Sequence, residues 1–114
     1  MFQNCYSLTS IDISKKSFSN VTIMNHMFYN CSQLTNLDLS IINTTKATNF
    51  EYMFAENYNL NVINISFFAI DDIAFYEGMF EGCDENLIII INSETFKNKE
   101  LLEYIENNFT VEYI

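Results

Sequence analysis

The dipeptide Met-Phe recurs at one fixed interval along this chain, and that interval constrains the fold more than any other feature. The pair begins at residues 1, 27, 53 and 79 and occurs nowhere else, so each interval is 26 residues. An amphipathic helix repeats its apolar positions about every 3.6 residues and a strand about every two, so neither explains the interval. A chain that returns to the same residue type at a long fixed period is typical of stacked, similar coils. The interval therefore predicts a repeat protein.

Apolar residues keep the same register behind each Met-Phe pair. In the first part of each unit they lie three apart, which predicts a tight helical turn, and then two apart, which predicts a short strand with alternate faces buried. In-register strands of successive coils would pair as a parallel sheet. The register is formed by Phe2, Phe28 and Phe54; Cys5, Cys31 and Cys83; Leu8, Leu34 and Leu60; Ile11, Leu37 and Ile63; and Ile13, Leu39 and Ile65.

The return half of each coil carries a second apolar row, which we expect to face inward because a single coil cannot bury its own apolar side. Turns in this half must come from Asn, Asp, Ser and Thr, since the chain has two glycines and no proline. The row consists of Val21 and Met24, then Ala47 and Phe50, then Ile73 and Tyr76.

The fourth unit departs from this pattern. Residues 87–91 read Leu-Ile-Ile-Ile-Ile, a strand that is apolar on both faces. The segment 96–108 follows, in which Leu101, Leu102 and Ile105 share one helical face and Asn98 is placed to cap the start. We predict a C-terminal strand–helix–strand cap, with the helix covering the second face of the strand and a last extended piece at 109–114.

The fold class predicted by these patterns is an α/β repeat: a leucine-rich-repeat-type solenoid with short parallel strands, one in each coil, and a C-terminal cap. Its 114 residues form one domain. Met1 already occupies a repeat position, so the first coil is expected to present an open edge. That edge predicts a fragment of a longer array and offers a surface for end-to-end association. The expected divisions are 1–26 (repeat 1), 27–52 (repeat 2), 53–78 (repeat 3), 79–95 (partial repeat 4) and 96–114 (cap).

The charge balance excludes some classes of partner. Fifteen acidic residues against five basic ones give a formal net charge of −10. Nucleic-acid binding needs a basic footprint, and attraction to anionic lipid needs basic residues, so we expect neither partner. The longest apolar run, 87–91, is too short to insert across a bilayer, and the chain opens without a signal-peptide pattern or an anchor.

The repeat unit resembles that of the BspA-like leucine-rich repeat surface proteins. The clearest stretches are 27–40, Met-Phe-Tyr-Asn-Cys-Ser-Gln-Leu-Thr-Asn-Leu-Asp-Leu-Ser, and 19–22, Ser-Asn-Val-Thr, and the resemblance extends from residue 1 to about residue 93. It implies display on a microbial cell surface or in the extracellular space, and adhesion to host matrix or other cells. The third copy departs from the pattern at Asn57, Asn64 and 69–74, which weakens any ligand surface there.

The chemically reactive side chains suggest no catalytic, cofactor or metal site. The cysteines Cys5, Cys31 and Cys83 share an inward position, which favours buried thiols over a metal site or a Cys5–Cys31 disulfide. His26 is the single histidine and is expected at the surface of a coil boundary. Asn-x-Ser/Thr sequons occur at Asn20, Asn30, Asn43, Asn64 and Asn108.

The outward row of the predicted strands is the candidate ligand face. Side chains between the inward strand residues point to solvent, and stacked repeats suit macromolecular partners. Asp12, Asp38 and Asn64 in this row indicate either cation or ligand binding, or ordinary solvent-facing residues. We expect a non-catalytic binding module for a protein or cell-surface macromolecule; the alternative is a structural spacer without a ligand. The face consists of Ser10, Asp12, Asn36, Asp38, Val62 and Asn64.

Overall fold

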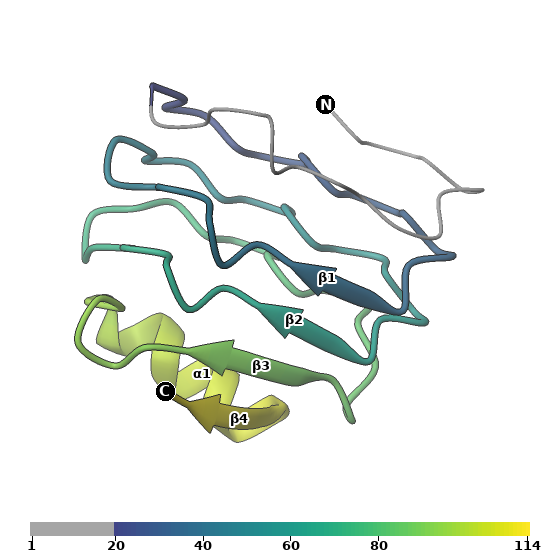
Figure 1. Cartoon of the computed structure of the whole chain (residues 1–114). Coiled ribbons are helices and arrows are strands. Elements are labelled where there is room, and N and C mark those ends of the chain that lie inside the picture. Colours follow the sequence, from purple (N-terminus) through teal and green to yellow (C-terminus); the bar gives the residue numbers. More distant parts are fainter. Residues whose placement is uncertain (1–19) are drawn as a thin grey trace.

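The computed structural model describes residues 20–114, which form a four-stranded parallel sheet with one helix, an α/β arrangement (Figure 1). The strands lie side by side in chain order, β1-β2-β3-β4. The helix α1 lies behind the sheet, beside β3 and β4. The elements are β1 (Asn36–Asp38), β2 (Val62–Asn64), β3 (Ile88–Ile91), α1 (Lys99–Asn108) and β4 (Thr110–Tyr113).

The 26-residue interval is the offset between neighbouring strands. Asn36 of β1 pairs with Val62 of β2, which pairs with Ile88 of β3, and the pairing is parallel throughout. The return halves keep the same offset, with single parallel bridges from Ile23 to Asn49 and on to residue 75. The predicted parallel pairing of in-register strands is therefore confirmed for the described residues.

A column of phenylalanine rings runs through the core. Phe28 and Phe54 stack with ring centroids 5.9 Å apart, and Phe54 and Phe80 stack at 5.4 Å. All three rings are buried. Phe109, from the segment after α1, continues the column at 5.7 Å from Phe80. Offset stacking adds to the free energy that burial of these large rings contributes. The predicted alignment of Phe28 with Phe54 is confirmed, whereas Phe2 lies outside the described residues.

The inward row of the return halves is confirmed in part. Met24, Ala47 and Phe50 are buried, but Ile73 is 78% exposed and the neighbouring Ala74 is buried in its place. The prediction for Ile73 is wrong because the turn begins one residue later in this copy. The Asp71 carboxylate accepts a hydrogen bond from the Ile73 amide at 3.2 Å, and this local bond fixes the turn at Asp71.

Helix α1 begins where the sequence predicts. Its N-cap is Asn98, whose side-chain oxygen accepts a hydrogen bond from the Leu101 amide at 3.0 Å. This bond pairs one of the amides that the first turn of a helix leaves without a partner. Leu101 and Ile105 are buried, as the shared face predicted.

The helix covers a different face from the one predicted. Leu101 and Ile105 join the same core as the inward residues of β3, Ile89 and Ile91. Ile88 and Ile90 lie outside that core and remain partly exposed on the other face of the sheet. The prediction was wrong because the end of the core, next to Phe80, needs cover more than the half-exposed face of one strand.

The chain bends sharply at two corners of each Met-Phe turn, and these turns are named here by residue number: the 26–30, 52–56 and 78–82 turns. Both corners have a positive φ, a conformation that side chains other than glycine rarely adopt. The first two turns nevertheless carry side chains there, and the third uses the two glycines of the chain. The φ values are 58° at His26, 54° at Tyr52 and 63° at Gly78 for the first corner, and 57° at Asn30, 64° at Glu56 and 79° at Gly82 for the second.

Candidate functional site

The outward face of the sheet brings the candidate residues of β1 and β2 into two rows. The first row runs from Asn36 to Val62, and the second from Asp38 to Asn64, along the pairing of the strands. Asn36 and Asp38 are exposed, while Val62 and Asn64 are half-buried. The remaining two candidates, Ser10 and Asp12, lie outside the described residues.

The acidic and amide side chains of this face also hold the ends of the strands. Oδ1 of Asp38 accepts a hydrogen bond from the Ser40 amide at 2.9 Å, and Oδ1 of Asn64 accepts one from the Ser66 amide at 3.0 Å. Hydrogen bonds from the side chain and backbone of Ser40 hold the pKa of Asp38 below its usual value. Each side chain therefore closes a turn with one oxygen, and a partner has to use the rest of the group.

The register extends these rows onto strands that the sequence prediction left out. Ile88 and Thr110 continue the first row, and Ile90 and Glu112 continue the second. Ile88 and Ile90 are half-buried, whereas Thr110 and Glu112 are exposed. The signal for the two isoleucines was available, since each lies 26 residues after a candidate residue of β2. It was missed because the helix was expected to cover them.

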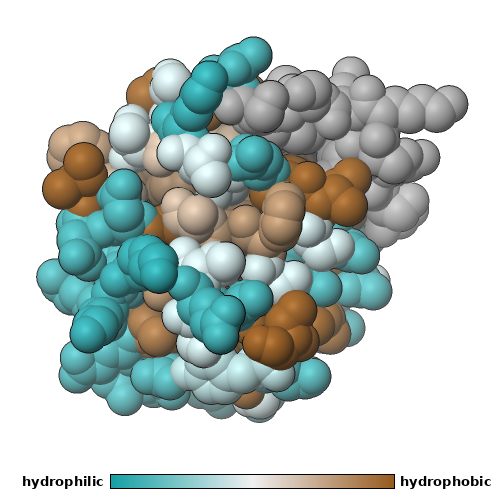
Figure 2. Space-filling view, turned by 60° about the vertical axis from the view of Figure 1, so that its left-hand side comes forward, coloured by the Kyte–Doolittle hydropathy of each residue, from teal (hydrophilic) through white to brown (hydrophobic). Residues whose placement is uncertain are grey.

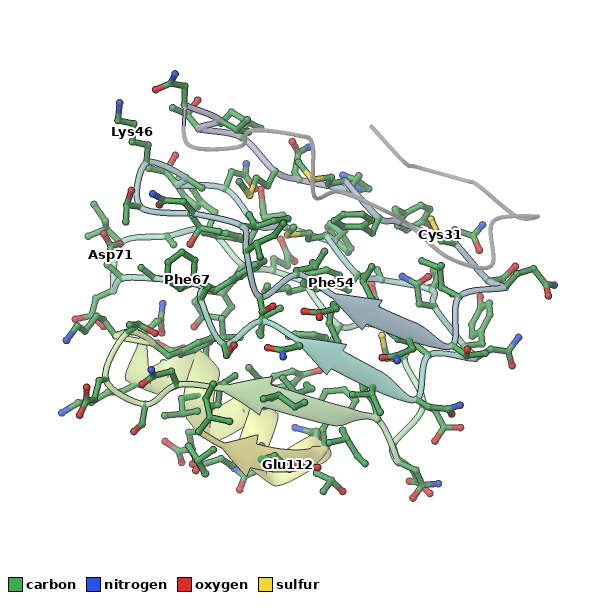
Figure 3. All side chains as sticks on the ribbon, in the orientation of Figure 1. Cys31, Lys46, Phe54, Phe67, Asp71 and Glu112 are labelled. Atoms are coloured by element: carbon green, nitrogen blue, oxygen red, sulfur yellow. The ribbon has the colours of Figure 1, made fainter. Side chains whose placement is uncertain are left out.

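Two large apolar side chains stand beside this face, just after the turns that end β1 and β2. Ile41 is 57% exposed and Phe67 is 55% exposed, and the two occupy the same position of the 26-residue register. Figure 3 shows Phe67 at the end of the sheet to which the strands point. The polar rows therefore have an exposed apolar neighbour, which the alternation of strand residues alone did not predict.

The cysteine position serves the backbone of the neighbouring Met-Phe turn. Cys31 is buried, as predicted, and Cys83 is half-buried. The Cys83 thiol donates to the Phe54 carbonyl, with an Sγ···O distance of 3.2 Å, and burial raises its pKa to about 12. Asn57, which replaces cysteine in the third copy, donates from Nδ2 to the carbonyls of Phe28 and Phe54 at 2.9 and 2.8 Å. The shared property of this position is a donor for a buried carbonyl. Cys5, and with it the Cys5–Cys31 alternative, lies outside the described residues.

His26 lies at the first corner of its turn, half-buried between two aromatic rings. Its ring stacks on Tyr52 at 5.2 Å and contacts Tyr29 at the same centroid distance, tilted by 59°. In residues 20–114, no three His, Cys, Asp or Glu side chains lie close enough together to hold a metal ion. Over the same residues, no helix has the length and apolar character to cross a bilayer.

The fold and its outward face define a small α/β protein whose strands are offset by one repeat interval. The chain belongs to the family described as "Mycoplasma protein of unknown function, DUF285", which matches residues 1–109. No curated protein and no solved structure matches the chain significantly. The family description carries no activity, so the function has to be argued from the side chains.

Proposed function

We propose that this chain is a leucine-rich-repeat-type solenoid of the BspA-like kind and acts as a non-catalytic binding module of a microbial surface protein. Its outward strand face, together with Ile41 and Phe67, binds a protein or another cell-surface macromolecule. The observation that carries the proposal is the exposed, in-register pair Ile41 and Phe67 beside the polar row of Asp38 and Asn64.

The offset between segments supports the solenoid. Strands and return bridges repeat the same 26-residue pairing, and the buried rings of Phe28, Phe54 and Phe80 form one column. Each segment thus contributes one layer to a shared core, as in proteins whose repeats contact only their neighbours. The resemblance of residues 27–40 to the BspA-like unit supports the surface location.

The composition of the face supports a macromolecular partner. Protein interfaces combine a few aromatic or apolar anchors with a polar rim that stays in contact with water. Phe67 supplies a large exposed ring, and Asn36 and Asp38 supply exposed polar groups. Figure 2 shows the side toward which the strands point, where apolar side chains form separate patches among hydrophilic ones. Such a surface fits an extended partner better than a small molecule.

The test is capture of the intact chain by immobilised collagen, laminin and fibronectin and by cultured host cells, measured by surface plasmon resonance and cell-binding assays. Phe67→Ser is expected to weaken capture about tenfold or more, because it removes the aromatic anchor. Phe75→Ser is the matched control, since Phe75 is 63% exposed and lies in the return half. Equal losses in the two variants would remove the support for this face.

A second pair of variants isolates the charge of the polar row. Asp38→Asn removes a negative charge but keeps the oxygen that accepts the Ser40 amide. Asp71→Asn makes the same change at an exposed aspartate that closes a turn in the return half. We expect only Asp38→Asn to change the association rate and its dependence on salt.

The alternative function is a structural spacer, and deletion of one whole unit distinguishes it. Removing residues 53–78 shortens the stack by one interval and takes Phe67 away. A binding surface loses affinity for its partner, whereas a spacer keeps whatever activity its parent protein has. If the parent chain binds none of the probes and the deletion changes nothing, the spacer is the better description.

A further inference from the structure

Alternate main-chain amides of each Met-Phe turn donate hydrogen bonds to the next turn along the chain. From the 26–30 turn, the amides of residues 26, 28 and 30 donate to carbonyls 25 residues further on, at 3.0, 2.9 and 2.9 Å. From the 52–56 turn, the corresponding three distances are 2.9, 2.9 and 2.7 Å. One turn therefore recognises a neighbouring segment through the carbonyls of its alternate residues.

The 78–82 turn has the same row of amides without this neighbour. Within residues 20–114, the amides of Gly78, Phe80 and Gly82 donate to no acceptor. The carbonyls of residues 76–81, in contrast, all accept hydrogen bonds, from the 52–56 turn or from within the turn. The unpaired groups of this row are all donors, and backbone donors away from bulk water are nearly always paired in folded proteins.

These amides face a pocket of about 440 Å³. Its size falls in the range of ligand-binding pockets. Gly78 and Gly82 have no side chains to fill it, and α1 forms the opposite wall. The pocket is lined by residues 76–83 and Glu85, and by Leu101, Tyr104, Asn108 and Phe109.

The charges around the pocket select among the ligands that unpaired amides attract. A row of amides alone favours an anion. Glu77, Glu81 and Glu85 are exposed lining residues, and the lining contains no Lys, Arg or His. Glu77 is also the main cause of the raised pKa of Tyr52, so the potential at this end is negative. A ligand with neutral carbonyls for the amides and cationic groups for the carboxylates satisfies both features, whereas an anion is repelled.

We propose that this pocket binds a basic peptide segment of a partner protein. Carbonyls of alternate residues of the peptide accept hydrogen bonds from the three unpaired amides, as the carbonyls of one turn do for the turn before it. Lys or Arg side chains of the peptide lie against the three glutamates. No lining residue belongs to the outward strand face, so this site goes beyond the proposed function and is tested separately from it.

The direct test is a ¹⁵N NMR titration of the full chain with the peptide acetyl-Ala-Lys-Ala-Lys-Ala-Lys-Ala-amide. Gly78 and Gly82 are the two glycines of the chain, so their amide signals are readily identified. We expect both amide protons to move downfield as hydrogen bonds form, and to become protected from exchange with solvent. The counterpart peptide with Glu in place of Lys is expected to leave both signals in place.

Variants with matched charge changes test the role of the glutamates. Glu81→Lys with Glu85→Lys is expected to weaken binding of the lysine peptide about tenfold. Glu94→Lys with Glu103→Lys changes the net charge by the same amount at exposed positions outside the pocket and should bind normally. Asn108→Trp fills the pocket from the exposed end of α1 and should abolish binding, with a dispersed NMR spectrum confirming that the variant folds.

Three results would overturn the proposal. The first is that both glycine signals stay in place at millimolar lysine peptide. The second is that they move equally with the glutamate peptide or with inorganic phosphate, which would identify an anion site. The third is that they move with protein concentration in the absence of peptide, which would identify a second copy of the chain as the occupant.

Discussion

The 52–56 and 78–82 turns follow the same main-chain path but have different surroundings. The 52–56 turn receives hydrogen bonds from the 26–30 turn and donates to the 78–82 turn. The 78–82 turn is bonded in this way on one side only, and on the other side it faces the pocket and α1. The inner turn carries Tyr52 and Glu56 at its left-handed corners, whereas the last turn has glycine at both.

The difference shows what allows a side chain at a left-handed corner. A residue other than glycine in this conformation costs about 1–2 kcal/mol. Hydrogen bonds on both sides over-determine the inner turn and hold it there despite this cost. The last turn has one set of such bonds and uses the residue for which the conformation is not strained. The glycines are also required sterically, since a Cβ at Gly78 would lie 2.2 Å from the Tyr52 ring.

The largest expected effect concerns the rings behind the two turns. Phe54 lies between Phe28 and Phe80, whereas the half-buried Phe109 ends the column. Phe54→Ala is expected to lower the free energy of unfolding by about 3–5 kcal/mol, because it opens a cavity inside the stack. Phe109→Ala should cost less than half as much. Urea denaturation measures both, and equal losses would mean that the column is not layered as described.

Amide hydrogen exchange compares the two turns directly. The amides of Tyr52, Phe54 and Glu56 are hydrogen-bonded, and those of Gly78, Phe80 and Gly82 are not. Under native conditions the first three should exchange at least about a hundredfold more slowly, a difference of about 2.7 kcal/mol in opening free energy. Similar protection in the two turns would show that the last row already has a partner, and the peptide proposal would lose its basis.

The position behind each turn is expected to differ in its response to pH. Asn57 in the inner turn does not titrate, while Cys83 in the last turn has a pKa raised to about 12 by burial. An acid with a raised pKa stabilises the fold fully below its unfolded pKa, near 9, and this stability is lost as the pH rises toward 12. At pH 10 the loss should be about 1 kcal/mol, one unit above the unfolded value.

Thermal unfolding of the parent chain and of Cys83→Ala between pH 8 and pH 10.5 measures this effect. The tyrosines are common to both proteins, so their titration cancels in the comparison. The stability of the parent should fall more steeply with pH than that of the variant. Parallel curves would mean that the thiol of Cys83 is not buried in the folded chain.

The smallest effect concerns the strained corner itself. Glu56→Gly should stabilise the fold by about 0.5 kcal/mol, because relief of the left-handed strain outweighs the added entropy of the unfolded chain. Glu51→Gly is the control, since Glu51 has no positive φ and should be destabilised by glycine. Chemical denaturation resolves the two signs, and destabilisation of the same size in both variants would remove the strain argument.

Features with a periodic signal could be predicted from the sequence. The register placed Phe28 over Phe54, and the pattern around Asn98 gave the start of α1. Where the chain departs from the period, local hydrogen bonds decided the outcome, as when Asp71 moved the turn and exposed Ile73. The half-exposed Ile88 and Ile90 were missed because an apolar strand does not reveal which of its faces a later helix covers.

The candidate strand face was only partly foreseeable for a related reason. Alternation placed Asn36 and Asp38 at the surface, and they are exposed. The turn-closing role of Asp38 depends on the amide two residues on, which sequence composition does not specify. The pocket was not predicted, because it is formed by unpaired main-chain amides, which the sequence does not reveal.

The one-way direction of the turn-to-turn hydrogen bonds sets the symmetry of any contact made there. A two-fold axis places a surface against its own copy, and a two-fold contact through this row would bring donors against donors. Such a contact forms no bonds between the rows. Molecules joined at this end therefore meet head to tail or through an unrelated partner that supplies acceptors, and a head-to-tail contact that does not close into a ring extends into a fibre.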